Sequence, residues 1–158
     1  VPSDRVIEKG DFVLMDYGAG YCDYRSDMTR TVVMGEPTQE QLDLYALVRR
    51  THEECVAAIH PGVEGNDIFK LSKKIIGDAG YGDYYNHGLG HGVGIDIHEL
   101  PNFNRSKNTI EVGSVITMEP GVYLPGVGGV RLEDYGVVTE NGYEPFTKTP
   151  HDLHIIDC

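Results

Sequence analysis

In the segment 11-DFVLMDYGAGYCDYRSDMTRTVVM-34, two apolar runs flank a short glycine-containing turn. Residues 11–17 and 28–34 have the length and the apolar, β-branched content of strands, and Gly-Ala-Gly after the first run supplies turn chemistry. We therefore expect an antiparallel hairpin or meander that carries Asp16 and Asp27.

Two helices are predicted after this strand pair. The first covers 38–60, since Thr38 and Gln41 form a capping-box pattern and Pro61-Gly62 follows as a stop signal. Its apolar residues recur at helical spacing: Leu42, Tyr45, Val48, Val56 and Ile59. The second helix covers 66–78, and the residues of its apolar face are Ile68, Leu71 and Ile75.

The second half of the chain is rich in glycine, histidine and β-branched residues, which indicates strands. Strands are expected over 90–98, 114–119 and 130–138, with a loop over 120–129 between the last two. Asn141-Gly142 marks a tight turn before a terminal strand around 143–147. This order predicts an α+β fold with helices on an antiparallel sheet, and the length favours one domain over 1–158.

The charge balance excludes several classes of partner. Thirteen basic residues against 25 acidic ones give a net charge of −12, whereas nucleic-acid binding and membrane-surface binding need basic patches. No run approaches the roughly 18 apolar residues of a transmembrane helix. The odd set of three cysteines, Cys22, Cys55 and Cys158, favours a reducing compartment and cytoplasmic placement. Because the chain begins with Val1, we expect it to be a piece of a longer one.

Four acidic residues stand in strand-like, otherwise apolar surroundings: Asp16, Asp27, Glu119 and Glu133. A lone buried carboxylate is costly, so each needs a cationic partner. Salt bridges with Arg30 or Arg131 would satisfy a single one of them. Four such residues beside a histidine-rich strand favour a shared cationic ligand instead.

The histidine-rich strand is 87-HGLGHGVGIDIH-98, which contains His87, His91 and His98. Its alternating glycines lack the G-x-G-x-x-G spacing of a dinucleotide site. The chain contains no HExxH, no GxSxG and no serine beside a plausible base, so nucleophilic catalysis is poorly supported. The remaining histidines are expected to have core or cap roles: His52, His60, His151 and His154.

A metal site explains this combination of residue types. Four carboxylates would neutralise two divalent cations, and one neutral imidazole would complete the set. Ligands rich in oxygen and free of thiolates favour Mn²⁺, or Co²⁺ and Zn²⁺, over copper or an iron–sulfur cluster. Paired metals suit hydrolysis, because they lower the pKa of water and stabilise an oxyanion. The residues thus indicate a dinuclear metallohydrolase without naming its substrate.

Four segments resemble the peptidase family with the pita-bread fold: 16-DYGAGYCDYRSDMTRT-31, 87-HGLGHGVGIDIHE-99, 117-TMEPGVY-123 and 130-VRLEDYGVVTENG-142. That family includes methionine aminopeptidases, aminopeptidase P, prolidase and the metal-free creatinase. The resemblance implies a curved antiparallel sheet with helices on its outer face. It also implies N-terminal truncation, because the family's domain begins upstream of Val1 with a segment that carries another substrate-contacting histidine. We expect the fragment to be catalytically impaired for that reason.

The resemblance also implies a role for each site residue. The family's metal ligands fall on Asp16, Asp27, His91, Glu119 and Glu133, of which Asp27 and Glu133 would bridge two metals. Glu119 would also accept and donate the proton of the reaction. His98 would contact the substrate, and the other positions that would line the site are His87, Tyr123 and Arg131.

The motif R-L-E-D at 131–134 and the stretch GIDIHELP at 94–101 resemble the proline-specific branch of the family. This implies hydrolysis of Xaa-Pro bonds in a proline-containing peptide, by a homodimer. Whether the substrate is a dipeptide or a longer peptide stays open. The alternatives are a methionine-type or broader aminopeptidase and a non-catalytic peptide-binding module. The non-catalytic module is disfavoured, because all five ligand positions are retained.

Overall fold

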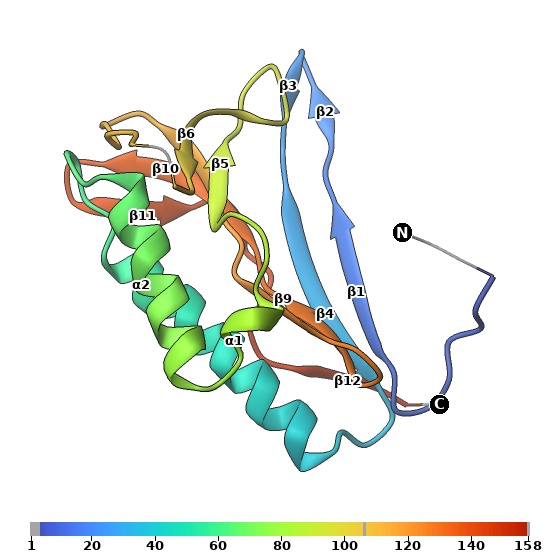
Figure 1. Cartoon of the computed structure of the whole chain (residues 1–158). Helices are drawn as coiled ribbons and strands as arrows, with labels where there is room; N and C mark the ends of the chain where they lie inside the picture. The colour runs from blue at the N-terminus through green and yellow to red at the C-terminus, as the bar shows by residue number, and fades with distance from the viewer. Residues whose placement is uncertain (1–3, 106, 158) are drawn as a thin grey trace.

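A computed structural model describes residues 4–105 and 107–157 (Figure 1). The strand pair predicted at the start of the chain is confirmed: β1 (Phe12–Tyr17) and β4 (Met28–Met34) are antiparallel, and Asp16 lies opposite Thr29. Between them the chain forms a small hairpin whose strands are β2 (Gly20–Tyr21) and β3 (Tyr24–Arg25). Cys22 and Cys55 are free thiols, and Cys158 lies outside the described residues.

Both predicted helices are present as α1 (Gln39–Ala57) and α2 (Gly65–Asp78), followed by a short 3-10 helix, η1 (Gly82–Tyr84). The capping box is confirmed, since the Thr38 hydroxyl accepts from the Gln41 amide and the Gln41 side chain accepts from the Thr38 amide. The prediction that this helix extends to residue 60 is wrong. The amides of residues 58 and 59 bond to carbonyls three residues back, which tightens the chain and ends the α-helix.

Burial along α1 agrees in part with the apolar spacing in the sequence. Of the residues at helical spacing, Tyr45 and Val48 are buried, whereas Leu42 is 39% exposed. Leu44 and Leu47, which are not in that set, are buried as well. Apolar residues occur on more than one side of this helix, and tertiary packing selected which of them became buried.

A five-stranded sheet forms most of the second half, in the order β11-β10-β7-β5-β6. The bounds of its strands are Gly90–Gly92 for β5, Glu99–Phe103 for β6, Val115–Met118 for β7, Asp134–Thr139 for β10 and Gly142–Pro145 for β11. The single strand predicted over 90–98 is wrong beyond residue 92. The Glu99 side chain accepts from the Asp96 amide and stabilises a bend there, after which β6 returns alongside β5.

The predicted loop over 120–129 is wrong, because it contains most of a second hairpin. Its strands are β8 (Gly121–Leu124) and β9 (Gly128–Arg131). Gly126 and Gly128 have φ of 83° and 134°, conformations that favour glycine and allow the turn. The strand predicted over 130–138 is accordingly divided between β9 and β10, and only β10 pairs with β7.

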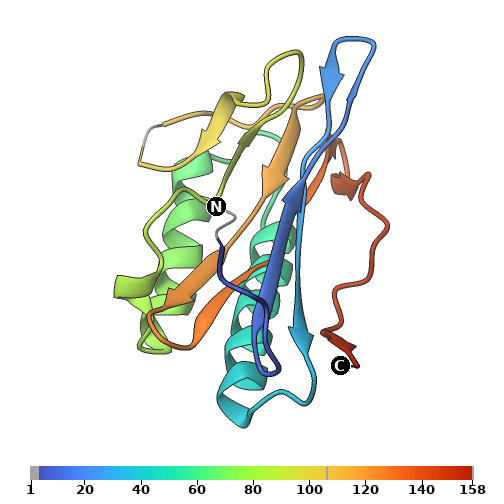
Figure 2. The same cartoon turned by 90° about the vertical axis from the view of Figure 1, so that its right-hand side faces the viewer.

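The C-terminal region contains a strand that the sequence did not predict. The strand expected at 143–147 corresponds to β11, which ends at Pro145, and the chain continues to β12 (His154–Ile156). β12 pairs in parallel with β4, so the sheet β1-β4-β12 is not purely antiparallel as predicted. Figure 2 shows this segment along the edge of β4.

Both helices lie on one face of the sheets, as Figures 1 and 2 show. Helix and strand side chains form a common core, in which Leu44 and Ile76 of the helices are fully buried together with Ile116, Met118 and Val130 of the strands. This confirms the α+β class. Among the described residues, no helix is long and apolar enough to cross a membrane.

The close packing of β5 against β7 can be tested by substitution of Gly90. A methyl group on Gly90 would overlap the Thr117 carbonyl oxygen of the neighbouring strand. Gly90→Ala should therefore lower the free energy of unfolding by about 1–3 kcal/mol, as overpacking does. Urea denaturation followed by circular dichroism measures the change. Gly77→Ala in α2 is the matched control, since no atom lies within 4 Å of the added methyl group; it should be neutral or stabilise by up to ~1 kcal/mol. Equal effects would contradict the packing of β5.

Candidate metal centre

The predicted ligands come from five separate parts of the chain. Asp16 lies near the end of β1, Asp27 directly before β4 and His91 in the middle of β5, while Glu119 follows β7 and Glu133 lies between β9 and β10. Backbone bonds between Thr29 and Glu133 join β4 to this last segment: the Glu133 amide donates to the Thr29 carbonyl over 3.1 Å. The sheet connections therefore carry all five positions toward one region.

Three of them form a compact group. The ligand atoms of Asp27, His91 and Glu133 lie within 4.8 Å of one another. His91 Nε2 is 3.7 Å from Asp27 Oδ2 and 3.4 Å from Glu119 Oε1. His91 Nδ1 lies 2.9 Å from the Gly92 carbonyl, and its other ring nitrogen, Nε2, faces the carboxylates.

Burial and mutual repulsion raise the pKa of these carboxyl groups. Glu133 is only 2% exposed, and its pKa is raised by desolvation and then by the nearby charges of Glu119 and Asp27. Desolvation also raises the pKa of Glu119 and of Asp27, and the charge of Asp16 adds to both shifts. A cluster of like charges of this kind is costly in the ionised form unless a cation joins it.

Asp16 takes a different position from the other carboxylates. Its side chain is half exposed and forms an ion pair with Arg131. This is the pairing that the sequence raised as an alternative to metal binding, and among the described residues it applies to Asp16 and, at a longer distance, to Glu119. Arg131 Nε is 4.0 Å from Glu119 Oε2, so the guanidinium also faces the compact group.

The remaining predicted site residues line the same cleft, which has a volume of about 1050 Å³. Arg131 donates to the Tyr123 hydroxyl over 2.9 Å, and that hydroxyl lies 3.1 Å from His87 Nε2. The His98 ring lies beside the His91 ring, with centroids 4.3 Å apart. Burial lowers the pKa of His87, which favours its neutral form. All candidate residues are thus brought together, and their individual roles stay predictions.

Two threonines that were not predicted from the sequence position the group. The buried Thr29 hydroxyl donates to Glu133 Oε2 over 2.6 Å and accepts from Arg131 Nε over 3.1 Å. The Thr117 hydroxyl accepts from the His91 amide over 3.0 Å. A signal for Thr29 was present, because it lies two residues after Asp27 and strand alternation places both on one face.

The other histidines separate into two pairs. His52 is buried in the core as predicted, and both it and His151 lie against Asp134. His60 and His154 are exposed and cap no helix, so the prediction of core or cap roles is wrong for these two.

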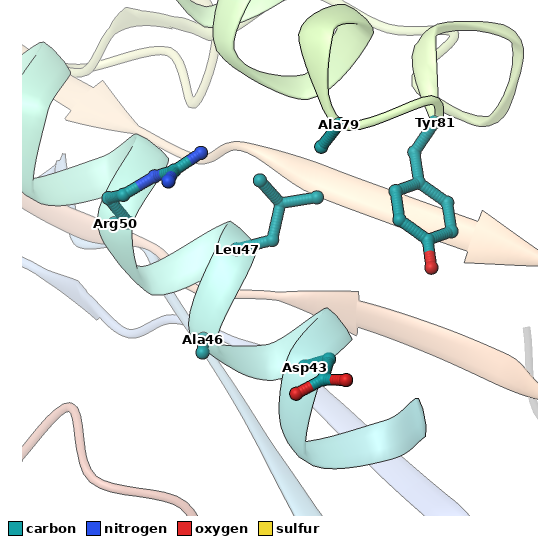
Figure 3. Close-up of a pocket in the computed structure, with 6 residues that line it drawn as sticks. All are labelled: Asp43, Ala46, Leu47, Arg50, Ala79 and Tyr81. Atoms are coloured by element: carbon teal, nitrogen blue, oxygen red, sulfur yellow. The ribbon is translucent and has the colours of Figure 1, made fainter. Parts of the chain in front are cut away.

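A further hollow of about 350 Å³ lies between the two helices (Figure 3). It contains one carboxylate, Asp43, and one guanidinium, Arg50, together with Ala46, Leu47, Ala79 and Tyr81. This set of side chains offers no group of metal ligands and no acid–base pair in a buried setting. The cleft around His91 is therefore the better functional candidate.

Comparison with known proteins places this arrangement in a family. Residues 1–140 match the model of metallopeptidase family M24. The chain belongs to this family. It is 46% identical over 154 residues to the Xaa-Pro dipeptidase of Pyrococcus furiosus, a match that covers 97% of this chain and 44% of that protein. The chain therefore spans less than half the length of such M24 relatives.

Solved structures of M24 proteins have the same fold. The prolidase from Pyrococcus horikoshii OT3 superimposes with a TM-score of 0.93 at 43% identity, over 96% of this chain and 44% of that one. The X-Pro aminopeptidase from Thermotoga maritima MSB8 gives a TM-score of 0.94 at 35% identity, over 98% and 44% of the two chains. The predicted pita-bread class is confirmed.

Membership of M24 implies divalent metals, and the residues present fit them. Carboxylate oxygens and one oriented imidazole face one another with a single cationic side chain, Arg131, beside them. Oxygen-rich sets of this kind suit hard or borderline divalent ions. The cost of holding like charges together is offset when such an ion binds.

The raised pKa of Glu133 gives a pH-dependent test. In the metal-free protein, the folded state keeps the Glu133 proton to a higher pH than the unfolded state does. Protonated Glu133 therefore contributes to the stability of the fold at low pH, and this contribution is lost as the pH rises. Glu133→Gln should therefore stabilise the metal-free protein at about pH 8 and have little effect at about pH 5. Denaturation of both proteins after chelation measures the difference. The same substitution should abolish stabilisation by added Mn²⁺; a variant that keeps full metal occupancy would contradict the assignment of Glu133.

Thr29 offers a second test of the centre. Thr29→Val preserves the shape of the side chain but removes the hydroxyl that bonds Glu133 and Arg131. Metal affinity measured by calorimetry should fall about 10–100-fold, as for other groups that orient ligands. The control is Thr51→Val in α1, where the lost hydroxyl bonds only the Leu47 carbonyl. Unchanged affinity in Thr29→Val would reduce Thr29 to a packing residue.

Proposed function

We propose that this chain carries the catalytic centre of a dinuclear metal-dependent hydrolase that cleaves Xaa-Pro peptide bonds. The observation that carries the proposal is the convergence of Asp27, His91, Glu119 and Glu133 beside a cleft that is lined by His91, Glu119 and Arg131 among others. The names of the relatives support the proline specificity, since they include Xaa-Pro dipeptidases and an X-Pro aminopeptidase. We further propose that 1–158 forms part of a single catalytic domain.

The proposed metal ligands are Asp16, Asp27, His91, Glu119 and Glu133, which would hold two divalent ions. Mn²⁺ is favoured by the four carboxylates, with Co²⁺ and Zn²⁺ as alternatives. When bound, such ions supply an activated water and stabilise negative charge on the carbonyl oxygen of the substrate. Asp27 and Glu133 are the proposed bridging ligands, and the separation of their ligand atoms, within 4.8 Å, supports this.

Glu119 is the proposed proton carrier. Its carboxyl group lies beside His91 and lines the cleft. There it would accept a proton from the attacking water and donate one to the departing amine of a bound peptide. Burial raises its pKa, which suits a group that must accept and then return a proton near neutral pH.

The other cleft residues would bind and orient the peptide. His98 lies beside the compact group and is the proposed donor to the carbonyl oxygen as its negative charge develops. The connected side chains of Arg131, Tyr123 and His87 form a polar wall. Its guanidinium would attract a carboxylate or carbonyl oxygen of the substrate.

The same fold also serves broader aminopeptidases, and whether dipeptides or longer peptides are cut is open. A homodimer is proposed on the exposed Tyr17, Tyr21 and Tyr24 of β1–β3, which offer apolar surface to a second copy. Sedimentation would test it. Cytoplasmic placement stays a prediction.

The experiment that tests the function combines metal analysis with peptide hydrolysis. After loading with Mn²⁺, close to two metals per chain and cleavage of Leu-Pro but not Leu-Ala are expected. His98→Ala should retain the metals and reduce turnover by about 10²–10³-fold, the value of one oxyanion-stabilising contact.

His154→Ala serves as the matched control, because this exposed histidine lies outside the cleft. Two bound metals with equal hydrolysis of Leu-Pro and Leu-Ala would contradict proline specificity. Unchanged turnover in His98→Ala would contradict its role.

A further inference from the structure

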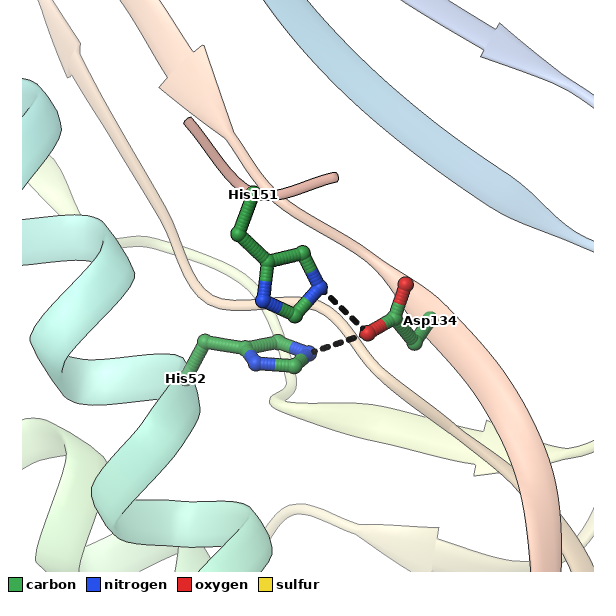
Figure 4. Close-up of side chains that lie close together, drawn as sticks. All are labelled: His52, Asp134 and His151. Carbon is green, nitrogen blue, oxygen red and sulfur yellow. Dashed lines mark hydrogen bonds and ion pairs between the residues drawn. The ribbon is translucent and has the colours of Figure 1, made fainter. Parts of the chain in front are cut away.

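A second group of ligand-type side chains lies outside the cleft (Figure 4). His52 belongs to α1, Asp134 begins β10, and His151 lies in the segment before β12. The three residues are far apart in sequence, and none of them lines the cleft around His91. Figure 4 shows both imidazoles directed at the carboxylate of Asp134.

The geometry of this group is close to that of a metal site. His151 Nε2 lies 2.6 Å from Asp134 Oδ2, and His52 Nε2 lies 3.5 Å from the same oxygen. The rings are 4.8 Å apart at 73°, and one ligand atom from each residue lies within 4.8 Å of the others. Ligand atoms in a tetrahedral zinc site are about 3.3 Å apart. The 3.5 Å between His52 Nε2 and Asp134 Oδ2 is close to this value, whereas the 2.6 Å between His151 Nε2 and the same oxygen is a hydrogen-bond distance.

His52 lacks a hydrogen-bond partner for either ring nitrogen, although its side chain is only 3% exposed. Buried polar atoms without a partner are rare and costly, so they require an explanation. Burial lowers the pKa of His52 to about 4, and the ring is therefore neutral at physiological pH. A neutral imidazole can present a lone pair to a metal ion.

Asp134 divides its two oxygens between different partners. Oδ1 accepts from Arg30 over 2.7 Å, while Oδ2 faces the two histidines. Besides Asp134, the Arg30 guanidinium donates to four backbone carbonyls, those of Thr29, Glu133, Thr149 and Pro150. Nitrogens of two imidazoles thus approach the same carboxylate oxygen of Asp134.

We propose that His52, Asp134 and His151 form a second metal site, separate from the M24 centre and structural in role, that binds a zinc-class divalent ion. Two imidazoles and one carboxylate with a water molecule are a common zinc set, whereas the oxygen-rich M24 centre suits Mn²⁺. For His151 to coordinate through Nε2, the proton that this nitrogen donates to Asp134 Oδ2 moves to Nδ1 or to solvent, and the ion replaces that hydrogen bond. Its side chain is 25% exposed on an irregular segment, which provides both access and room for a small shift.

The bound ion would fasten the C-terminal segment to the helix layer and the sheet. That segment already bonds α1 through Tyr45, which donates to the His151 carbonyl, and through Arg49, which pairs with Asp152. A metal ion that joins α1, β10 and residue 151 adds a link that only the folded chain can form. Zn²⁺ should therefore raise the thermal midpoint.

The test uses the whole chain in a His91→Gln background, in which the imidazole ligand of the M24 centre is absent. Zn²⁺ equivalents per chain are measured by elemental analysis, and Co²⁺ absorption bands report tetrahedral coordination. Adding His151→Gln should remove one equivalent, the Co²⁺ bands and the Zn²⁺-dependent rise in the thermal midpoint. Adding His154→Gln, an exposed histidine three residues away, should change none of these.

Equal Zn²⁺ binding with and without His151→Gln would overturn the site, and so would an equal loss in His154→Gln. His52→Gln provides a second removal of a ligand, and circular dichroism checks that each variant folds. Because all variants share His91→Gln, the result is independent of whether the M24 centre hydrolyses Xaa-Pro bonds.

Discussion

The Glu133 carboxylate is buried among apolar strands, and the polar groups around it offset the free-energy cost of that burial. An isolated buried carboxylate costs several kcal/mol. Here the Thr29 hydroxyl donates to one oxygen, Arg131 lies beyond that hydroxyl, and a histidine approaches from β5. Each of these groups comes from a different strand. The position of the charge thus requires β4, β5 and β9 to meet at one place.

Two successive residues of β4 hold the Glu133 segment, one through its side chain and the other through its backbone. The Thr29 hydroxyl faces the Glu133 carboxylate, while Arg30 donates to the Glu133 carbonyl and to Asp134. The backbone of the Glu133 segment is thereby held from one side and its carboxylate from the other. Arg30 also bonds the carbonyls of residues 149 and 150, so the C-terminal segment depends on the same side chain. Disturbance at Arg30 would reach both the cleft and β12.

Local sequence signals predicted the elements whose structure is decided locally. The capping box at Thr38 and the apolar run at 12–17 are complete within a few residues, and both are confirmed. β12 was missed because three residues carry no periodic signal and pair only with a strand more than a hundred positions earlier. The hairpin β8-β9 was missed because its glycines resemble loop residues, although Gly129 packs against the Tyr123 ring.

The candidate site, too, was predicted from the sequence only in part. The residue types at Asp16, Asp27, His91, Glu119 and Glu133 indicated a metal centre because four carboxylates and an imidazole make little sense as a core. The sequence could not predict which carboxylate would pair with Arg131, since that depends on how β1 and β9 approach each other. The same limit explains why His52 and His151 were expected only to have core or cap roles. That both approach one oxygen of Asp134 depends on how the helix, the sheet and the C-terminal segment pack together, and local sequence carries no signal for it.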